Sequence, residues 1–214
     1  MTESSSGIIL RTRPLTETSL IVHWLTPELG RIATVAKGAR RAQSPFAGKL
    51  DLFYAADFSF SRSRRSELHT LREVGLRETH GAIREDFRKL QQAGYAVAFL
   101  EQATETETPL PEIFDLIRGF LKTLCGRAPQ PRDIFALELK LLAELGLAPD
   151  GEEAQLTPGA KKIVRALLEG DADAVSRLKL SEAQAGELGR FLQGFLIFHL
   201  GRLPRGRLAA IGEP

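Results

Sequence analysis

Apolar and polar positions alternate along the first third of the chain. From Gly7 to Leu76, runs rich in β-branched and aromatic residues are separated by turn-forming residues, a pattern typical of antiparallel strands. In "LIVHWL" every second side chain shares one face, and the turn "TPELG" that follows contains Pro27 and Gly30. The predicted strands are Gly7–Leu15, Ser19–Thr26, Arg31–Lys37, Leu52–Ser61 and Ser66–Leu76.

Five short strands in a segment of about 75 residues favour a small closed or partly closed barrel. The OB-fold is the commonest nucleic-acid-binding barrel of this size, although alternation alone does not separate it from an SH3-like barrel. We expect Trp24, Phe58 and Phe60 to lie in the core. Phe46 is the aromatic residue that we expect to be exposed, because it lies between two strands in a loop.

The apolar period changes to three or four residues after Thr79, which indicates helices. Helix starts are expected at Pro109–Pro111, at Thr157–Pro158, and at Ser181, whose spacing to Gln184 is that of a capping box. The segment "PRDIFALELKLLAELG" is apolar on more than one side and is expected at the centre of a bundle. The stripes of the first and last long helices are Ile83, Phe87, Leu90, Val97 and Leu100, then Leu188, Phe191, Leu192, Phe195 and Phe198.

The predicted fold class is therefore α+β, with an N-terminal β-barrel of the OB-fold or SH3-like type in residues 1–80 and a C-terminal helical bundle in residues 81–214. The chain has 214 residues, of which 43% are hydrophobic, enough to bury a core. A single cysteine, Cys125, fits a reducing compartment. The opening "MTESSSGIIL" lacks the features of a secretory signal, and no long apolar stretch predicts a membrane span, so we expect a cytoplasmic protein.

Positive charge is concentrated locally. The whole chain has a net charge of only +2, but residues 1–80 contain 12 Lys and Arg against 8 Asp and Glu. The loop "VAKGARRAQSPFAGKLDLF" combines cations with small residues that let a nucleic-acid backbone approach. On charge alone, phosphate binding and an ordinary solvated surface are equally supported. The candidate DNA-binding residues are Arg31, Lys37, Arg40, Arg41, Lys49, Arg62, Arg64 and Arg65.

Groups that carry catalysis are sparse in the sequence. The four histidines, His23, His69, His80 and His199, are scattered without metal-ligand spacing, and Cys125 ends an apolar helical stripe. No glycine-rich phosphate-binding signature is present. We therefore expect a protein that is not an enzyme and that uses no metal and no cofactor.

The order of several segments resembles the RecO family of bacterial recombination mediators. They are "TPELGRIATVAKGARR", "LREVGLRETHGAIREDFRKLQQAGYAVAFLEQATE", "FALELKLLAELGLAPD", "LTPGAKKIVRALLEGD" and "FLIFHLGRLPRGR". The resemblance implies an OB-fold and a helical bundle that bind single- and double-stranded DNA and anneal complementary strands. It also implies that the protein works with RecR, recognises the C-terminal tail of the single-strand-binding protein SSB, and indirectly helps RecA to replace SSB. Lys37, Arg40 and Arg41 fall on the family's basic loop motif, which implies phosphate contact.

Many members of that family carry a four-cysteine zinc module between the "LGLAPD" and "LTPGA" segments. Here only "GEEAQ", Gly151–Gln155, joins them, so we expect no zinc module near residues 150–156. An SSB tail needs an apolar pocket beside a cation. The phenylalanine-rich last helix with Arg202, Arg205 and Arg207 is one candidate for that pocket, and the alternative is that these phenylalanines are simply core.

Two functions follow from these observations. The leading hypothesis is a DNA-binding annealing and RecA-loading factor. The alternative is a protein-interaction adaptor for RecR and SSB with little DNA binding of its own, which the near-neutral overall charge favours.

Overall fold

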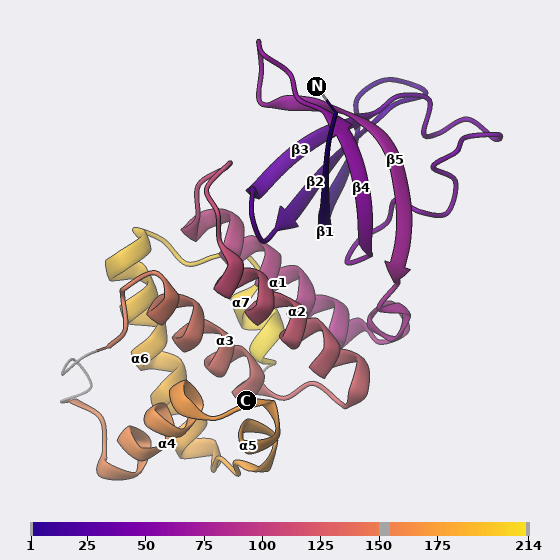
Figure 1. The fold of residues 1–214 in the computed structure, drawn as a ribbon. Helices are drawn as coiled ribbons and strands as arrows, with labels where there is room; N and C mark the ends of the chain where they lie inside the picture. Colours follow the sequence, from indigo (N-terminus) through magenta and orange to yellow (C-terminus); the bar gives the residue numbers. More distant parts are fainter. Residues whose placement is uncertain (1, 150–154, 213–214) are drawn as a thin grey trace. The chain divides into compact units, whose positions relative to one another are not determined.

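Five strands close into a barrel in a computed structural model of the chain, which describes residues 2–149 and 155–212 (Figure 1). The order around the barrel is β1-β2-β3-β5-β4, and β4 pairs back onto β1. Neighbouring strands are antiparallel except β3 and β5, which are parallel. This is the five-stranded OB-fold predicted from the sequence. The strands are β1 (Thr2–Pro14), β2 (Leu20–Thr26), β3 (Gly30–Ala36), β4 (Ala55–Ser61) and β5 (Leu68–Glu78).

All five predicted strands are present, and two of their starts differ from the prediction by three or more residues. β1 begins at Thr2, because the polar residues before Gly7 pair with β4 from Thr2↔Ser61 onward. β4 begins later than predicted, at Ala55. Phe53 has a φ of 64°, outside the extended region, and this takes the preceding residues out of the strand.

The barrel core contains the aromatic side chains expected there. The ring of Trp24 stacks on Phe58 with centroids 4.1 Å apart, and its Nε1 donates a hydrogen bond to Thr34 Oγ1 at 2.9 Å. Phe60 is also fully buried. The expectation for Phe46 is wrong, because this ring is only 6% exposed and packs into the same core. The loop between β3 and β4 folds back over the barrel, and Phe46 supplies its apolar anchor.

The chain forms two compact units. One combines Met1–Gly81 with Glu105–Arg118, and the other combines Ala82–Thr104 with Gly119–Pro214. In the first unit a later segment therefore joins the barrel, which the sequence did not indicate. Its backbone pairs with the start of β3, where the Glu107 N–H donates to the Arg31 carbonyl at 2.9 Å and the Leu110 N–H donates to the Pro27 carbonyl at 3.2 Å.

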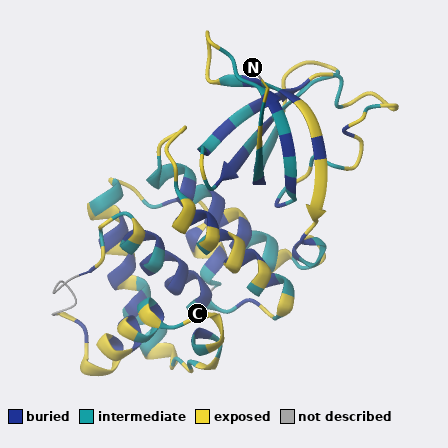
Figure 2. Ribbon diagram, in the orientation of Figure 1, coloured by how far each residue is buried: buried dark blue, intermediate teal, exposed yellow. Residues whose placement is uncertain are grey.

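The second unit is helical, and α3 is its most buried helix, as predicted (Figure 2). Thr157 caps α4 by accepting from the Ala160 N–H, and Ser181 with Gln184 forms the predicted capping box of α6. A short 3₁₀ helix, η1, and the helices α5 and α7 were not predicted. The elements after β5 are η1 (Gly81–Ile83), α1 (Phe87–Ala103), α2 (Pro111–Gly126), α3 (Pro131–Glu144), α4 (Pro158–Glu169), α5 (Ala172–Arg177), α6 (Glu182–Leu200) and α7 (Arg207–Ile211).

The predicted apolar stripes hold with four exceptions, of which Leu90 is the smallest, because it is half-buried. Ile83 is buried but lies in η1, before α1 starts. Phe87, the first residue of α1, is 73% exposed. Phe198 of α6 is 79% exposed, although the other members of its stripe are buried. A helical period identifies a face, but burial of a residue near the end of a helix depends on whether another element covers it.

Candidate nucleic-acid interface

The loop of residues 37–54 leaves β3 as a chain of turns. Successive backbone hydrogen bonds join Ala39 to Ala36, Arg41 to Gly38, Ser44 to Arg41, Ala47 to Ser44 and Lys49 to Phe46. Gly38 and Gly48 have φ values of 70° and 71°, which favour glycine. The loop is thus held by its own turns and by the buried ring of Phe46.

Three of the predicted cations are exposed on this loop: Lys37, Arg40 and Arg41, while Lys49 is half-buried. Arg40 ties the loop to the turn between β1 and β2, because its backbone N–H donates to the Thr18 carbonyl at 3.0 Å and its Nη1 to the Thr16 carbonyl at 3.3 Å. In the described part of the chain none of the four side chains makes an ion pair. Their charges therefore remain available to an external anion.

Arg62 is placed differently from the loop cations. Its Nε and Nη2 donate to the two carboxylate oxygens of Glu3 at 2.8 and 3.0 Å, and its Nη1 donates to Glu107 at 3.2 Å. The hydrogen bond from Arg62 holds the pKa of the Glu3 carboxyl below its usual value, and the same bond raises the pKa of Arg62. The guanidinium of Arg62 is thus already neutralised by the protein.

Arg31, Arg64 and Arg65, the remaining predicted cations, lie near the start of β3. Arg64 and Arg65 are exposed in the turn between β4 and β5, and Arg31 is the second residue of β3. Lys37 follows the other end of the same strand, about 20 Å away at the usual rise per residue. The structure therefore divides the eight predicted cations between the two ends of β3.

The outward face of β1, β2 and β3 lies on the same side of the barrel as Lys37 of the loop. In the barrel register Arg11 is opposite His23, which is opposite Ala33, and Arg13 is opposite Ile21, which is opposite Val35. The intervening positions of β2 and β3, such as Trp24 and Thr34, face the core. Arg11 and Arg13 consequently lie on the outward face, on the same side as Lys37.

Arg11 and Arg13 are not among the eight predicted cations, although their two-residue spacing is a signal that places both on one face of a strand. A register shift between Ile9 and Arg11 interrupts the alternation of β1, which obscures in the sequence which face the two arginines occupy.

Most aromatic rings of the barrel that could stack on bases are unavailable, because they are buried. They are Trp24, Phe46, Phe53, Phe58 and Phe60.

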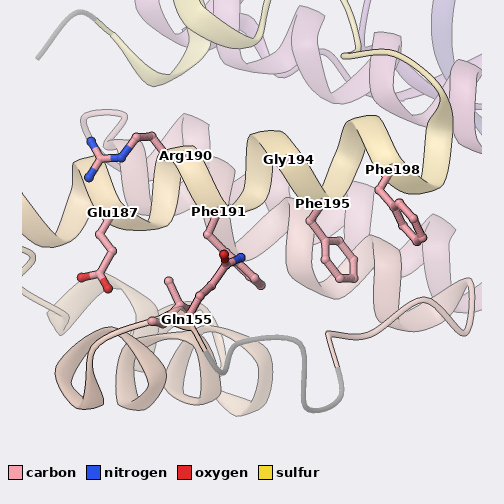
Figure 3. A pocket seen from close by; sticks show the side chains of 8 residues that line it. Gln155, Glu187, Arg190, Phe191, Gly194, Phe195 and Phe198 are labelled. Atoms are coloured by element: carbon pink, nitrogen blue, oxygen red, sulfur yellow. The ribbon is translucent and has the colours of Figure 1, made fainter.

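The last long helix of the helical unit lines a groove of about 640 Å³. Figure 3 shows Phe191, Phe195 and Phe198 along one side of α6. Arg190 also lines this groove, and the nearby carboxylate of Glu187 accepts hydrogen bonds from the backbone N–H and Oγ1 of Thr157 at 2.6 and 2.9 Å. The groove therefore has an apolar floor with one cation at its border.

Of the candidate cations Arg202, Arg205 and Arg207, only the first two are exposed to solvent. Arg207 is 3% exposed and forms an ion pair with Glu138 at 2.7 Å. Arg207 therefore does not contribute its charge to the candidate pocket, because a buried guanidinium needs an internal counter-ion. Arg202 and Arg205 are exposed but do not line the groove.

Residues 2–149 and 155–212 contain no group of three or more His, Cys, Asp or Glu side chains placed to hold a metal ion. The short connection predicted in place of a zinc module falls on Gly151–Gln155, of which 151–154 lie outside the described residues. Cys125 is half-buried in α2. Among the described helices, none combines the length and the apolar character needed to cross a membrane.

These observations define an OB-fold protein with an exposed cationic loop and a separate helical unit. The chain belongs to the RecO family, because residues 1–80 match the model "Recombination protein O N terminal" and residues 84–153 match "Recombination protein O C terminal". The resemblance noted in the sequence is thereby confirmed. The helices α4 to α7 lie beyond both matched ranges.

Similar proteins include three called DNA repair protein RecO. The one from Anaeromyxobacter dehalogenans (strain 2CP-C) is 31% identical over 144 residues, which cover 67% of this chain and 57% of the relative. The one from Rhodopirellula baltica is 32% identical over 67% of this chain and 53% of its own length, and the one from Bacillus pumilus is 32% identical over 68% and 56%. The chain thus matches little more than half the length of these curated relatives.

Proposed function

We propose that the protein is a DNA-binding recombination mediator that anneals complementary single strands and helps to load RecA onto SSB-coated DNA during repair. It acts by binding and not by catalytic turnover, in the bacterial cytoplasm at the nucleoid. The observation that carries the proposal is the set of exposed cations, Lys37, Arg40 and Arg41, beside the outward barrel face that bears Arg11 and Arg13. The relatives called DNA repair protein RecO support the same role.

The chemistry of this surface suits the DNA backbone more than the bases. Lysine and arginine neutralise phosphates and release counterions, whereas base stacking needs exposed rings, and most barrel rings are buried. A surface that contacts only phosphates binds both single- and double-stranded DNA with little sequence preference. An annealing factor needs this property, because it holds the strand before and after pairing.

A salt titration tests the proposal. Fluorescence anisotropy of a labelled single-stranded oligonucleotide is measured with the full chain at increasing salt. If about five phosphates are neutralised, the slope of log K against log salt is about −3.5, and fourfold more salt weakens binding about 100-fold. Changing Lys37, Arg40 and Arg41 together to Ala should reduce the slope by about 2.

The matched control removes three exposed cations of the helical unit, Lys161, Lys162 and Arg165, by the same change to Ala. It alters the net charge equally and should leave most of the slope intact, since these residues are not on the barrel. An unchanged slope in the folded loop variant, or an equal loss in both variants, contradicts the assignment of the loop.

We propose RecR and the SSB C-terminal tail as protein partners, with RecA affected indirectly. A second groove in the helical unit, of about 480 Å³, supports the tail as a ligand. Its wall includes Leu208, which is 75% exposed, and the cations Arg132 and Arg190. An acidic, apolar tail requires this combination. The affinity of the protein for SSB, compared with its affinity for SSB lacking the tail, measures how much the tail contributes to binding.

The alternative proposal is an adaptor that binds RecR and SSB while DNA is held mainly by others. The two grooves of the helical unit favour it. The anisotropy titration separates the two functions: micromolar or tighter binding of DNA by the isolated chain at moderate salt contradicts the adaptor. Absence of binding, with SSB binding retained, contradicts the mediator.

A further inference from the structure

Arg62 and His69 form a small anion site at the end of the barrel. His69 is 1% exposed, and its ring stacks on Phe60 with centroids 5.3 Å apart. The Ser63 N–H donates to its Nδ1 at 3.4 Å, so the proton of a neutral ring resides on Nε2. This Nε2 lies 3.1 Å from one carboxylate oxygen of Glu107, and Arg62 Nη1 donates to the other oxygen at 3.2 Å.

The carboxylate that occupies the site comes from the segment that follows α1. The Glu107 N–H donates to the Arg31 carbonyl, and the next residue, Thr108, packs its carbonyl against Gly30 so closely that a Cβ there would lie 1.8 Å from the oxygen. The segment of residues 105–110 thus adds backbone pairing to the start of β3, before the pairing of β3 with β5 begins at Ala33, next to the anion site.

Glu107 is held in an unfavourable backbone conformation. Its φ is 55°, and in the described part of the chain only Phe53 and His80 are further non-glycine residues with a positive φ. A glutamate adopts this region only when surrounding contacts enforce it, and such strain is concentrated at functional sites. The contacts of Glu107 with Arg31 and Arg62 thus hold a conformation that its backbone alone does not favour.

We propose that Glu107 is an internal competitor of DNA, whose carboxylate occupies a phosphate site until the segment of residues 105–110 leaves. The site consists of His69 Nε2 and of Nη1 of Arg62, the nitrogen that Glu3 does not contact. The proposal rests on DNA binding by the barrel. A guanidinium donates to phosphate oxygens as it does to a carboxylate, and His69 Nε2, which is buried beside Glu107 without a hydrogen-bond partner among the described residues, offers a second donor. Arg64 and Arg65 are exposed on the same turn, so a strand that displaces Glu107 meets further cations there.

The test compares DNA binding by Glu107→Gln with binding by the wild-type chain across salt. The neutral amide competes less, so one further phosphate contact should steepen the slope by about 0.7 and tighten binding about fivefold at 0.1 M salt. Glu105→Gln is the matched control: it removes the same charge from an exposed neighbour, and it should leave the slope unchanged. Circular dichroism verifies that both variants are folded.

The double variant Arg62→Ala with Glu107→Gln identifies the cation. This double variant should lose the tighter binding and the steeper salt slope of Glu107→Gln, because the site then lacks its guanidinium. Equal gains in Glu105→Gln and Glu107→Gln, no gain in Glu107→Gln, or a gain that survives Arg62→Ala each overturn the proposal. A wild-type chain that binds no DNA at any salt concentration instead contradicts the proposed function, so the two failures are distinguishable.

Discussion

The guanidinium of Arg207 forms a bidentate ion pair with the carboxylate of Glu138. The two contacts, from Nε and Nη2, are 2.7 and 2.9 Å long, and both side chains are buried, with 3% and 0% exposed. The hydroxyl of Tyr95 also donates to this carboxylate, and burial beside Glu138 raises the pKa of Tyr95, which keeps the donor protonated. Together these contacts connect α7, α3 and α1 inside the helical unit.

Removing one member of this pair should strongly destabilise the helical unit. Arg207→Ala leaves the Glu138 carboxylate buried without its cation, which costs about 3–5 kcal/mol. Urea unfolding of the full chain followed by circular dichroism measures the change. Arg118→Ala is the control, because it breaks the exposed pair of Arg118 with Asp115 and should cost less than about 1 kcal/mol. Equal effects of the two changes would show that the buried pair carries no special stability.

The buried ring of Phe46 should anchor the cationic loop. Phe46→Ala removes a ring that packs into the barrel core, so it should reduce the free energy of unfolding by about 3–5 kcal/mol. Phe198→Ala removes an exposed ring and should change stability by no more than about 0.5 kcal/mol. Thermal and urea unfolding compare the two variants. A Phe46 variant as stable as the wild type would mean that the ring lies outside the core in solution.

Gly30 should be intolerant of a side chain for two reasons. Its φ is 63°, and an added Cβ would collide with the Thr108 carbonyl. Gly48 is a matched control, since its φ is 71° but no atom lies within 4 Å of the added Cβ. Gly48→Ala should cost about 1–2 kcal/mol from the backbone alone. Gly30→Ala should cost about 1–3 kcal/mol more, because the segment must move. Urea midpoints of both variants test this difference.

The pair of Glu3 with Arg62 should make stability sensitive to acid. Because Arg62 lowers the pKa of the folded Glu3 carboxyl below its ordinary value of 4.5, the ion pair contributes its full stability above that pH. This contribution is lost as the pH falls through the lowered pKa. Glu3→Gln should therefore lower the melting temperature at pH 7 and reduce its decline between pH 5 and 3. Glu17→Gln, in the exposed loop after β1, should leave that decline as in the wild type.

Much of the fold could be predicted because its signals are local. The alternation around Trp24 predicts a strand, and Thr157 and Ser181 predict helix starts, since strand faces and helix caps depend on residues within a few positions. The concentration of charge at Lys37, Arg40 and Arg41 is likewise visible in the sequence, and the structure leaves these three side chains exposed.

The errors concern contacts between distant residues. Phe46 is surrounded by polar and small residues but is buried, because the loop folds over the barrel. Arg62 and Arg207 look like free cations, yet Glu3, Glu107 and Glu138 neutralise them from 45 to 69 residues away. Ion pairs over such separations leave no periodic pattern in a sequence.

The sequence by itself determined the change from strands to helices, the strand and helix periods and the cationic loop, because hydrophobic periodicity and capping act over short distances. Only the tertiary structure decided which cations face solvent and which are paired. It also placed Arg11 and Arg13 on the outward face and brought Glu107 against Arg62 and His69. These outcomes depend on strand register and on backbone pairing between segments far apart in the chain, which follow from the packing of the whole barrel.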